Sequence, residues 1–384
     1  MNNDLLPIPL LESLIRFPSV SSTSNVDITV HIEAVLDRLG FSLSRCDYRD
    51  ARGVEKANLI ATRAPAAGKS SGAGIAYFCH TDVVPADDWS GPGGPFDPVV
   101  TDDRIYGRGS CDMKGSLVAM LSAISRIDAA SQTAPIHVIC TADEEVAFVG
   151  AKHIVAHSQD YRDLVTSQPV AIIGEPTRCE VVHAHKGIFV FRIISRGRAA
   201  HSSTRDGVNA NLAMVPMLVE LLRLHDWSEN DPSLQDGRFD PPTLSWNFGF
   251  TDHAKASNIV PARSEAWVSL RTMPTIDGET LVAAAAEKAK ELGLEFKREK
   301  GGGYVWIEPD APVIREMCEV AKCEHPKTVC YGTDGGEFTQ LKRMVICGPG
   351  DIAQAHTSDE FITKAQLDQG IEIYSAAIHR WCTG

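Results

Sequence analysis

The sequence predicts an α/β catalytic domain that is interrupted by a smaller α+β domain. The chain has 384 residues, more than the roughly 250 to 300 at which a single hydrophobic core stops growing. In its two outer segments, short apolar runs of strand character alternate with helical segments, which is the pattern of an α/β fold. The middle segment has the order strand, helix, strand, strand, helix, strand, which is that of ferredoxin-like folds.

The predicted elements of the outer segments follow from the spacing of their apolar residues. Gly40 stands where the second predicted helix should end, as expected of a C-cap residue. The predicted helices span residues 10–17, 28–39, 117–127, 151–157, 311–321 and 364–381. The predicted strands span residues 58–62, 75–79, 135–140, 170–174, 327–330 and 344–347.

The middle segment is expected to form a domain of its own. Its predicted strands span residues 188–194, 243–250, 266–270 and 295–298, and its predicted helices span residues 212–224 and 280–292. We therefore assign residues 1–185 and 299–384 to the catalytic, metal-binding domain and residues 186–298 to the inserted domain.

Composition disfavours several classes of partner. Lys and Arg number 37 against 50 Asp and Glu, a net charge of -13 without a basic cluster, so neither nucleic acid nor an anionic membrane is expected as a partner. Residues 1–14 lack the basic start of a signal peptide, and no run of about 18 apolar residues could span a bilayer. The ten cysteines form no CxxC pair, which favours reduced thiols in the cytoplasm.

Ligand-type side chains stand at or just beyond the ends of three predicted strands. They are His80, Glu144, Glu145 and Glu175. In open α/β sheets, catalytic and ligand-binding residues are commonly found at the ends of the strands. An acid two residues after His80, Asp82, can accept the second imidazole N–H and fix the tautomer. Each of these residues could instead be an ordinary turn or capping residue.

Two further candidates lie in loops. Asp112 follows Gly107 and Gly109 and precedes the predicted helix 117–127, a place where backbone amides can hold an anion or a metal-bridging carboxylate. His356 lies in the polar stretch after the last predicted strand.

Together these residues offer two imidazoles and three carboxylates, namely His80, Asp112, Glu145, Glu175 and His356. Mixed ligands of this kind suit Zn²⁺ better than Mg²⁺ or Ca²⁺. One catalytic zinc needs only three protein ligands, whereas two ions that share one carboxylate would use all five. Such a pair polarises a carbonyl and generates hydroxide near neutral pH. Glu144 is left over and would serve as the general base.

Five motifs carry a family resemblance, and they occur in this order: His80-Thr-Asp82, Gly107-Arg-Gly-Ser-Cys-Asp112-Met-Lys-Gly115, Thr141-Ala-Asp-Glu144-Glu145, Gly174-Glu175-Pro-Thr177 and Ala355-His356. In them the chain resembles the co-catalytic zinc deacylases and exopeptidases, a family that includes acetylornithine deacetylase, succinyl-diaminopimelate desuccinylase, aminoacylase and glutamate carboxypeptidase. The resemblance covers nearly the whole chain. It implies a zinc-exopeptidase-like catalytic domain, a mixed sheet flanked by helices, with an inserted ferredoxin-like dimerisation or lid domain.

The resemblance also implies roles for individual residues. Two ligand sets are implied: His80, Asp112 and Glu175 for one zinc, and Asp112, Glu145 and His356 for the other. Asp82 would orient His80, and Glu144 would be the general base. Co²⁺ or Mn²⁺ could occupy the same ligands. A non-proline cis peptide bond is implied after Asp112.

For the inserted domain, the resemblance implies a homodimer in which His201 reaches the partner subunit's site and stabilises the tetrahedral oxyanion. Asn258 and Arg271 would hold the substrate's carboxylate. The loop expected to line the same pocket comprises Gly332, Thr333, Asp334 and Gly335. Asp334 or Glu337 could meet an ammonium group of the substrate or simply cap the next helix.

Residues 184–187 and 350–361 look most like the acetylornithine deacetylase branch, which implies hydrolysis of a small N-acyl amino acid, N2-acetyl-L-ornithine, to L-ornithine and acetate in arginine biosynthesis. Within the family, the alternatives are a succinyl-diaminopimelate desuccinylase, a broad N-acyl-amino-acid deacylase or a dipeptidase. Outside it, Cys111 beside His80 could form a cysteine hydrolase, or the chain could be a catalytically silent binding protein. Both of these readings leave Glu144 without a role.

Overall fold

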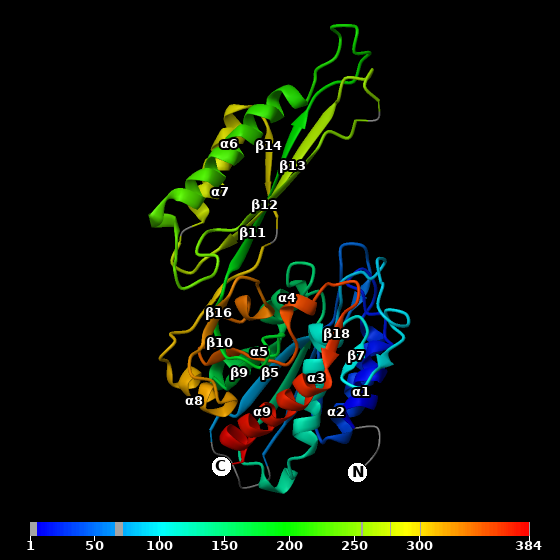
Figure 1. Ribbon diagram of the computed structural model, residues 1–384, viewed down its shortest axis with the longest axis vertical. Coiled ribbons are helices and arrows are strands. Elements are labelled where there is room, and N and C mark those ends of the chain that lie inside the picture. Colours follow the sequence, from blue (N-terminus) through cyan, green and yellow to red (C-terminus); the bar gives the residue numbers. More distant parts are fainter. Residues whose placement is uncertain (1–5, 66–71, 255, 277, 300, 384) are drawn as a thin grey trace. The chain divides into compact units, whose positions relative to one another are not determined.

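The computed structural model describes residues 6–65, 72–254, 256–276, 278–299 and 301–383. It forms two compact units (Figure 1). Unit 1 comprises Met1–Ala184, Trp306–Lys327 and Thr333–Gly384, and unit 2 comprises His185–Val305 and Thr328–Gly332. Unit 2 contains the segment expected as the inserted domain, residues 186–298. It also includes His185, residues 299–305 and residues 328–332.

Unit 1 is built on a nine-stranded mixed sheet. Its strands lie in the order β1 (Ser42–Arg45), β4 (Leu59–Arg63), β8 (Ile136–Thr141), β5 (Ile75–His80), β9 (Val170–Ile173), β17 (Met344–Ile346), β10 (Val182–His185) and β15 (Val305–Trp306), and β16 (Lys327–Val329) pairs with β10. The four central strands β8, β5, β9 and β17 are parallel. Strands β1, β4 and β10 run antiparallel to their neighbours. The α/β prediction with a mixed sheet is confirmed.

Helices cover both faces of this sheet because its central strands are apolar on both sides. All six residues of β5 are buried. Successive side chains point to opposite faces, so Tyr77 contacts Tyr374 of α9 (Lys364–Cys382) while Phe78 contacts Phe338 on the other face. The Tyr77 face is covered by α9 together with α1 (Pro7–Ile15), α2 (Val26–Arg38), α3 (Gly115–Ser125) and α8 (Pro312–Ala321). The Phe78 face is covered by α5 (Gln159–Ser167), whose Tyr161 also contacts Phe338, and α5 is preceded by α4 (Val149–His157).

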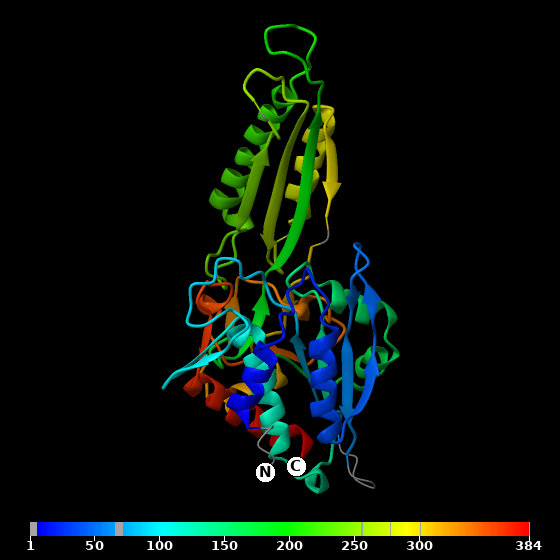
Figure 2. The same cartoon turned by 90° about the vertical axis from the view of Figure 1, so that its right-hand side faces the viewer.

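Unit 2 has the predicted ferredoxin-like arrangement. Its four-stranded sheet has the order β12 (Trp246–Thr251), β13 (Arg263–Thr272), β11 (Gly187–Arg196) and β14 (Glu295–Arg298), with antiparallel neighbours. Its helices α6 (Asn211–Asn230) and α7 (Glu279–Glu291) lie together on one side of the sheet (Figure 2). The edge position of β12 leaves one of its sides without a strand partner in this sheet.

The elements that the sequence did not predict are mostly short. They include the two-stranded sheet β2 (Tyr48–Arg49) and β3 (Glu55–Lys56), the three-stranded sheet β18 (Phe361–Thr363), β7 (Arg104–Tyr106) and β6 (Val99–Val100), and the turns η2 (Ser110–Lys114), η3 (Ala129–Ser131), η4 (Pro232–Leu234), η5 (Asp334–Gly336) and η6 (Ile352–Gln354). These segments have only two to five residues, which is too short for a detectable periodicity. Among the described residues, no helix is both long and apolar enough to cross a membrane.

Helix α9 begins with a capping box, which generates a stability prediction. The Thr363 hydroxyl accepts a hydrogen bond from the Gln366 N–H, and the Gln366 side chain accepts one from the Thr363 N–H. We expect Thr363→Ala to lower the free energy of unfolding by about 1 kcal/mol, measured by urea denaturation, because the Gln366 N–H loses its side-chain acceptor. The control is Thr166→Ala in α5, whose hydroxyl only bonds back to the Arg162 carbonyl. Equal losses in the two variants would contradict a role of the cap.

Candidate active site

The ends of three neighbouring parallel strands bring together the predicted site residues of unit 1. His80 is the last residue of β5, which lies between β8 and β9 in the sheet. Glu144 and Glu145 follow the end of β8, and Glu175 follows the end of β9. Because the carboxyl ends of parallel strands meet at one edge of a sheet, these side chains converge there.

Asp112 lies between two histidines. Its Oδ1 is 3.0 Å from Nε2 of His80, and its Oδ2 is 3.5 Å from Nε2 of His356. The same His356 nitrogen is 3.0 Å from Oε1 of Glu145. The Asp112 side chain is only 8% exposed, so its two oxygens serve two separate imidazoles from a buried position. This is the geometry of a bridging carboxylate.

Within the part of the chain that the structure describes, three groups of side chains have ligand atoms that lie within 4.8 Å of one another. They are His80 with Asp112 and Glu175, Asp112 with Glu145 and His356, and His80 with Glu144 and Glu145. The first two are the ligand sets implied by the motifs. The third places Glu144 within reach of both ligand sets, as a group that exchanges protons at the site would have to be.

Buried carboxyl groups crowd this edge of the sheet. Burial is the main reason that the pKa values of Glu144 and Glu175 lie well above the usual range for a glutamate, and it also raises the pKa of Glu145. For His80, burial lowers the pKa, but the hydrogen bond with Asp112 and the surrounding carboxylates raise it well above the usual value. A cluster of carboxylate oxygens and imidazole nitrogens fits divalent cations of the first transition row.

Asp82 holds His80 by its main chain and not by its carboxylate. Nδ1 of His80 is 2.8 Å from the carbonyl oxygen of Asp82 and 3.7 Å from its Oδ1. A carbonyl only accepts hydrogen bonds, so Nδ1 carries the proton and Nε2 faces Asp112, on the side of the ligand atoms. The Asp82 carboxylate instead accepts hydrogen bonds from the Ser21 hydroxyl at 2.6 Å and from the N–H groups of Glu144 and Glu145 at 3.1 and 3.4 Å. The expectation that the carboxylate orients His80 is therefore corrected.

The loop that presents Asp112 is held by a residue whose role the sequence analysis missed. The buried carboxylate of Glu360 accepts hydrogen bonds from the N–H groups of Gly109, Cys111 and Asp112 at 2.8 to 3.0 Å. It also forms a buried ion pair with Arg108 at 2.9 Å. Glu360 lies four residues after His356, and this spacing within one polar stretch was the available signal. The peptide bond after Asp112 is cis, as expected.

Gly109 is required by the same loop. Its φ is +81°, and a Cβ atom there would lie 2.7 Å from Cγ1 of Val83. A side chain at this position would therefore be strained and would displace the loop.

Three predicted substrate residues belong to unit 2. His201 is exposed, with Nδ1 2.7 Å from the Ser203 hydroxyl, and its backbone pairs with Ile259. The carbonyl of Asn258 accepts a hydrogen bond from the N–H after His201, so these two residues are neighbours. Arg271 lies on β13 opposite Ile188. Their roles in binding a substrate stay predictions.

The loop after β16 runs from Gly332, the last residue of unit 2, into unit 1. The Thr333 hydroxyl accepts a hydrogen bond from the Gly335 N–H and caps η5, so the cap is Thr333 and not Asp334. Asp334 is buried, accepts a hydrogen bond from the Thr141 hydroxyl through Oδ2, and has no partner for Oδ1 among the described residues. Burial raises the pKa of Asp334 to about 7. Glu337 pairs with Lys152 at 3.7 Å.

The model of the peptidase family M20/M25/M40 matches residues 76–380. The chain belongs to this family. Acetylornithine deacetylase of Proteus mirabilis is 32% identical over 98% of this chain and 96% of that protein. Acetylornithine deacetylase of Myxococcus xanthus is 31% identical over the full length of both. The resemblance to the co-catalytic zinc deacylases and exopeptidases is confirmed, and the chain is a metal-dependent amidohydrolase.

Solved structures of other M20 proteins share the fold. A metallo-carboxypeptidase of the M20 family from Sulfolobus solfataricus has a TM-score of 0.77 at 17% identity and covers 98% of this chain and 99% of its own. A dipeptidase from Saccharomyces cerevisiae has a TM-score of 0.74 at 16% identity over 97% of this chain and 94% of its own. At these identities the likeness establishes the fold alone.

The shared position of Asp112 generates a prediction about metal content. Asp112 belongs to both of the ligand sets implied by the motifs, whereas Glu175 and His356 each belong to one of them. We expect Asp112→Ala to bind less zinc per chain than either Glu175→Ala or His356→Ala, measured by elemental analysis after dialysis. Equal zinc contents in the three variants would contradict the bridging position.

Proposed function

We propose that this chain hydrolyses the N-acetyl amide of N2-acetyl-L-ornithine to L-ornithine and acetate, as a step of arginine biosynthesis. The observation that carries the chemistry is the position of Asp112 between His80 and His356, with Glu144 beside both ligand sets. The choice of substrate is supported by relatives of that name that match this chain over nearly its full length at 31 to 32% identity.

The proposed cofactor is a pair of zinc ions, for which Co²⁺ or Mn²⁺ could substitute. His80, Asp112 and Glu175 would hold one ion, and Asp112, Glu145 and His356 the other. When bound, the ions would polarise the scissile carbonyl and lower the pKa of the attacking water.

Glu144 is the proposed general base. It would take the proton from the attacking water and deliver it to the leaving nitrogen. Its backbone is fixed by the hydrogen bond from its N–H to Asp82 at 3.1 Å. Its carboxylate lies with the ligand atoms of His80 and Glu145, so a proton held there is close to the reacting atoms.

Residues of three segments are proposed to take part in substrate binding and turnover. The guanidinium of Arg271, with Asn258, would bind the substrate's carboxylate, for which a planar fork of N–H donors is suited. His201 would stabilise the tetrahedral oxyanion in the partner subunit's site. Residues Gly332, Thr333, Asp334 and Gly335 would line the pocket, and Asp334, with its unpartnered buried oxygen, would meet the substrate's ammonium group.

A homodimer is proposed, with unit 2 as its contact domain. Helix α6 exposes apolar side chains at helical spacing: Leu212, Val215, Val219 and Leu222, which are 77, 54, 61 and 49% exposed. The edge strand β12 in the same unit has one side free of a strand partner within its sheet. An apolar stripe together with an open sheet edge fits a second copy of the same unit. The cytoplasm is the proposed location, supported by ten cysteines that are all unpaired.

The substrate proposal is tested by steady-state hydrolysis of N2-acetyl-ornithine, N-succinyl-diaminopimelate, N-acetyl-methionine and a dipeptide. We expect the highest kcat/KM for N2-acetyl-ornithine, loss of activity on chelation and recovery with zinc. A preference for another member of the panel would keep the amidohydrolase and correct the substrate. If none of the four compounds is hydrolysed after zinc reconstitution, the proposed function is refuted.

Glu144→Ala is expected to keep its zinc and its melting temperature while kcat falls by about 10³-fold, within the range for loss of a general base. The matched control is Glu180→Ala, which removes a surface carboxylate of unit 1 paired with Lys327. Loss of one zinc from Glu144→Ala would make Glu144 a ligand instead, and ordinary turnover would remove it from the mechanism.

The action of His201 across the dimer is tested by subunit mixing. Neither His201→Ala nor Glu144→Ala should turn over substrate at an appreciable rate as a homodimer. In a mixed dimer, one site would combine an intact Glu144 with an intact His201 from the partner. We expect recovery of up to about half of the wild-type activity per mixed dimer, since only one of its two sites is complete. Verified mixed dimers without recovery would exclude the role in trans.

A further inference from the structure

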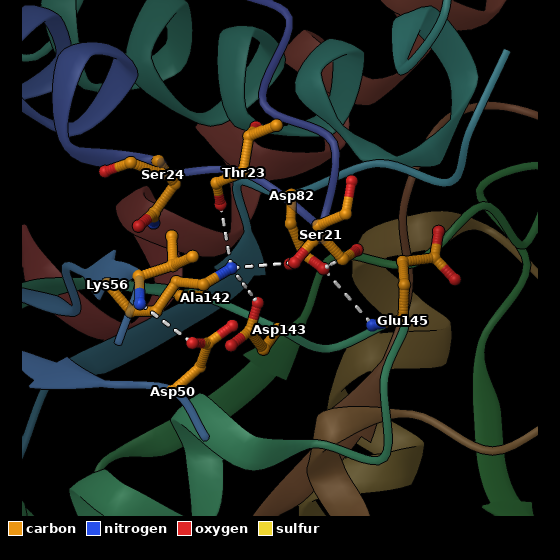
Figure 3. A network of polar contacts seen from close by, with 12 residues as sticks. Ser21, Thr23, Ser24, Asp50, Lys56, Asp82, Ala142, Asp143 and Glu145 are labelled. Carbon is orange, nitrogen blue, oxygen red and sulfur yellow. Dashed lines mark hydrogen bonds and ion pairs between the residues drawn. The ribbon is translucent and has the colours of Figure 1, made fainter. Parts of the chain in front are cut away.

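A buried network of polar contacts joins Lys56, Ser21, Asp82 and Asp143 to the turn that carries Glu145 (Figure 3). At its centre is Lys56, the last residue of β3, which is 1% exposed. Its ammonium group forms an ion pair with the carboxylate of Asp143 and donates to the carbonyl oxygens of Ser21 and Thr23, both at 2.8 Å. Tyr48 donates its hydroxyl to the other Asp143 oxygen at 2.7 Å.

The contacts of Lys56 continue into a closed ring. The Ser21 hydroxyl donates to the Asp82 carboxylate at 2.6 Å, and that carboxylate accepts the N–H of Glu144 at 3.1 Å. Glu144 is bonded in sequence to Asp143, whose carboxylate pairs with Lys56. The ring therefore runs from Lys56 through Asp143, Glu144 and Asp82 to Ser21 and back to Lys56.

We propose that Lys56 is a positioning residue of the active site, which aims Glu144 and Glu145 by holding Asp143 and Ser21 at fixed places. The inference rests on the proposed function for its effect on turnover. Among the described residues, the polar contacts of Lys56 are with Asp143, Ser21 and Thr23, so Lys56 acts on Glu144 and Glu145 through the backbone of the turn.

The backbone of Asp143 shows why the turn needs such a support. Its φ is +55°, in the left-handed region that few residues other than glycine adopt. A strained backbone conformation of this kind is kept only where the surrounding contacts hold it in place. A change of φ at Asp143 would swing the two glutamates that follow it, and a displacement of about 1 Å can cost roughly 10²-fold in rate.

The chemistry of the ammonium group fits this task closely. Lysine offers three N–H donors, and the three acceptors around Lys56 are the Asp143 carboxylate and the two carbonyls. A methionine would fill a similar volume but would leave the carboxylate without its cation and both carbonyls without this donor, which is unfavourable in a buried place.

The first test compares Lys56→Met with a matched control, Arg63→Met. Arg63 is also a buried cation of unit 1, and it donates a hydrogen bond to the Gln132 side chain at 2.7 Å. Its strand partner is Ile136 at the start of β8, whereas the turn with Glu144 and Glu145 follows the end of β8. We expect Lys56→Met to lower kcat by about 10²-fold with KM within about threefold of wild type. Arg63→Met should lose thermal stability while keeping kcat within about twofold, as expected of a contact remote from the site.

The second readout does not depend on turnover. Because Glu145 follows the same turn, Lys56→Met should weaken zinc binding about tenfold, the scale expected for loss of a group that supports a ligand. Competition with a chromophoric chelator measures this affinity, and Arg63→Met should bind zinc as the wild type does. If Lys56→Met does not fold, Tyr48→Phe removes one hydrogen bond to Asp143 and should shift kcat and zinc affinity in the same direction by less.

The outcomes separate the inference from the proposed function. A wild-type protein that binds zinc but hydrolyses none of the four amides would refute the function, and the zinc titration would still decide the role of Lys56. The positioning role would be overturned if the wild type is active and Lys56→Met has the same kcat and zinc affinity as Arg63→Met. If Lys56→Met does not fold, the same comparison is made with Tyr48→Phe.

Discussion

The crowding of buried carboxylates at one edge of the sheet is the constraint on which the site depends. Withdrawing a carboxylate from water is costly, and neighbouring carboxylates repel one another. The chain pairs its nearby buried cations with the supporting acids: Lys56 with Asp143, and Arg108 with Glu360. These cations favour the charged form of the supporting acids. Burial raises the pKa values of the ligand residues Glu145 and Glu175, and bound divalent cations would favour their charged form in the same way.

Two kinds of support hold the ligands in place. His80 and the glutamates follow strand ends, whose positions are set by the hydrogen bonds of the central sheet. Asp112 and His356 come from loops, and there a single carboxylate takes over the task. Glu360 binds three N–H groups of the Asp112 loop and is only four residues from His356. Charge-assisted hydrogen bonds of this kind are among the stronger contacts available, so one residue ties the two loop ligands together.

The central strands and the ligand residues were predictable because their signals are local. Strands buried on both faces read as continuous apolar runs, as β5 does, and His80, Glu145 and Glu175 stand at or just beyond the ends of such strands. Lys56 was not predictable, because it lies on a two-residue strand and its partner Asp143 is 87 residues away. The spacing of His80 and Asp82 correctly indicated a contact, but only the backbone conformation decides that the carbonyl, not the carboxylate, faces the imidazole.

The division of the chain explains why the chemistry is easier to infer than the substrate. The residues of the ligand groups belong to unit 1, whereas His201, Asn258 and Arg271 belong to unit 2. The ligand set therefore supports the reaction class, whereas the choice of substrate depends on residues whose binding roles stay proposals. The loop from Gly332 to Glu337 passes from unit 2 into unit 1, and its buried Asp334 bonds to Thr141 at the end of β8. If this loop lines the substrate pocket as proposed, the anchor of Asp334 to Thr141 at the end of β8 limits how far a substitution in the loop can move it.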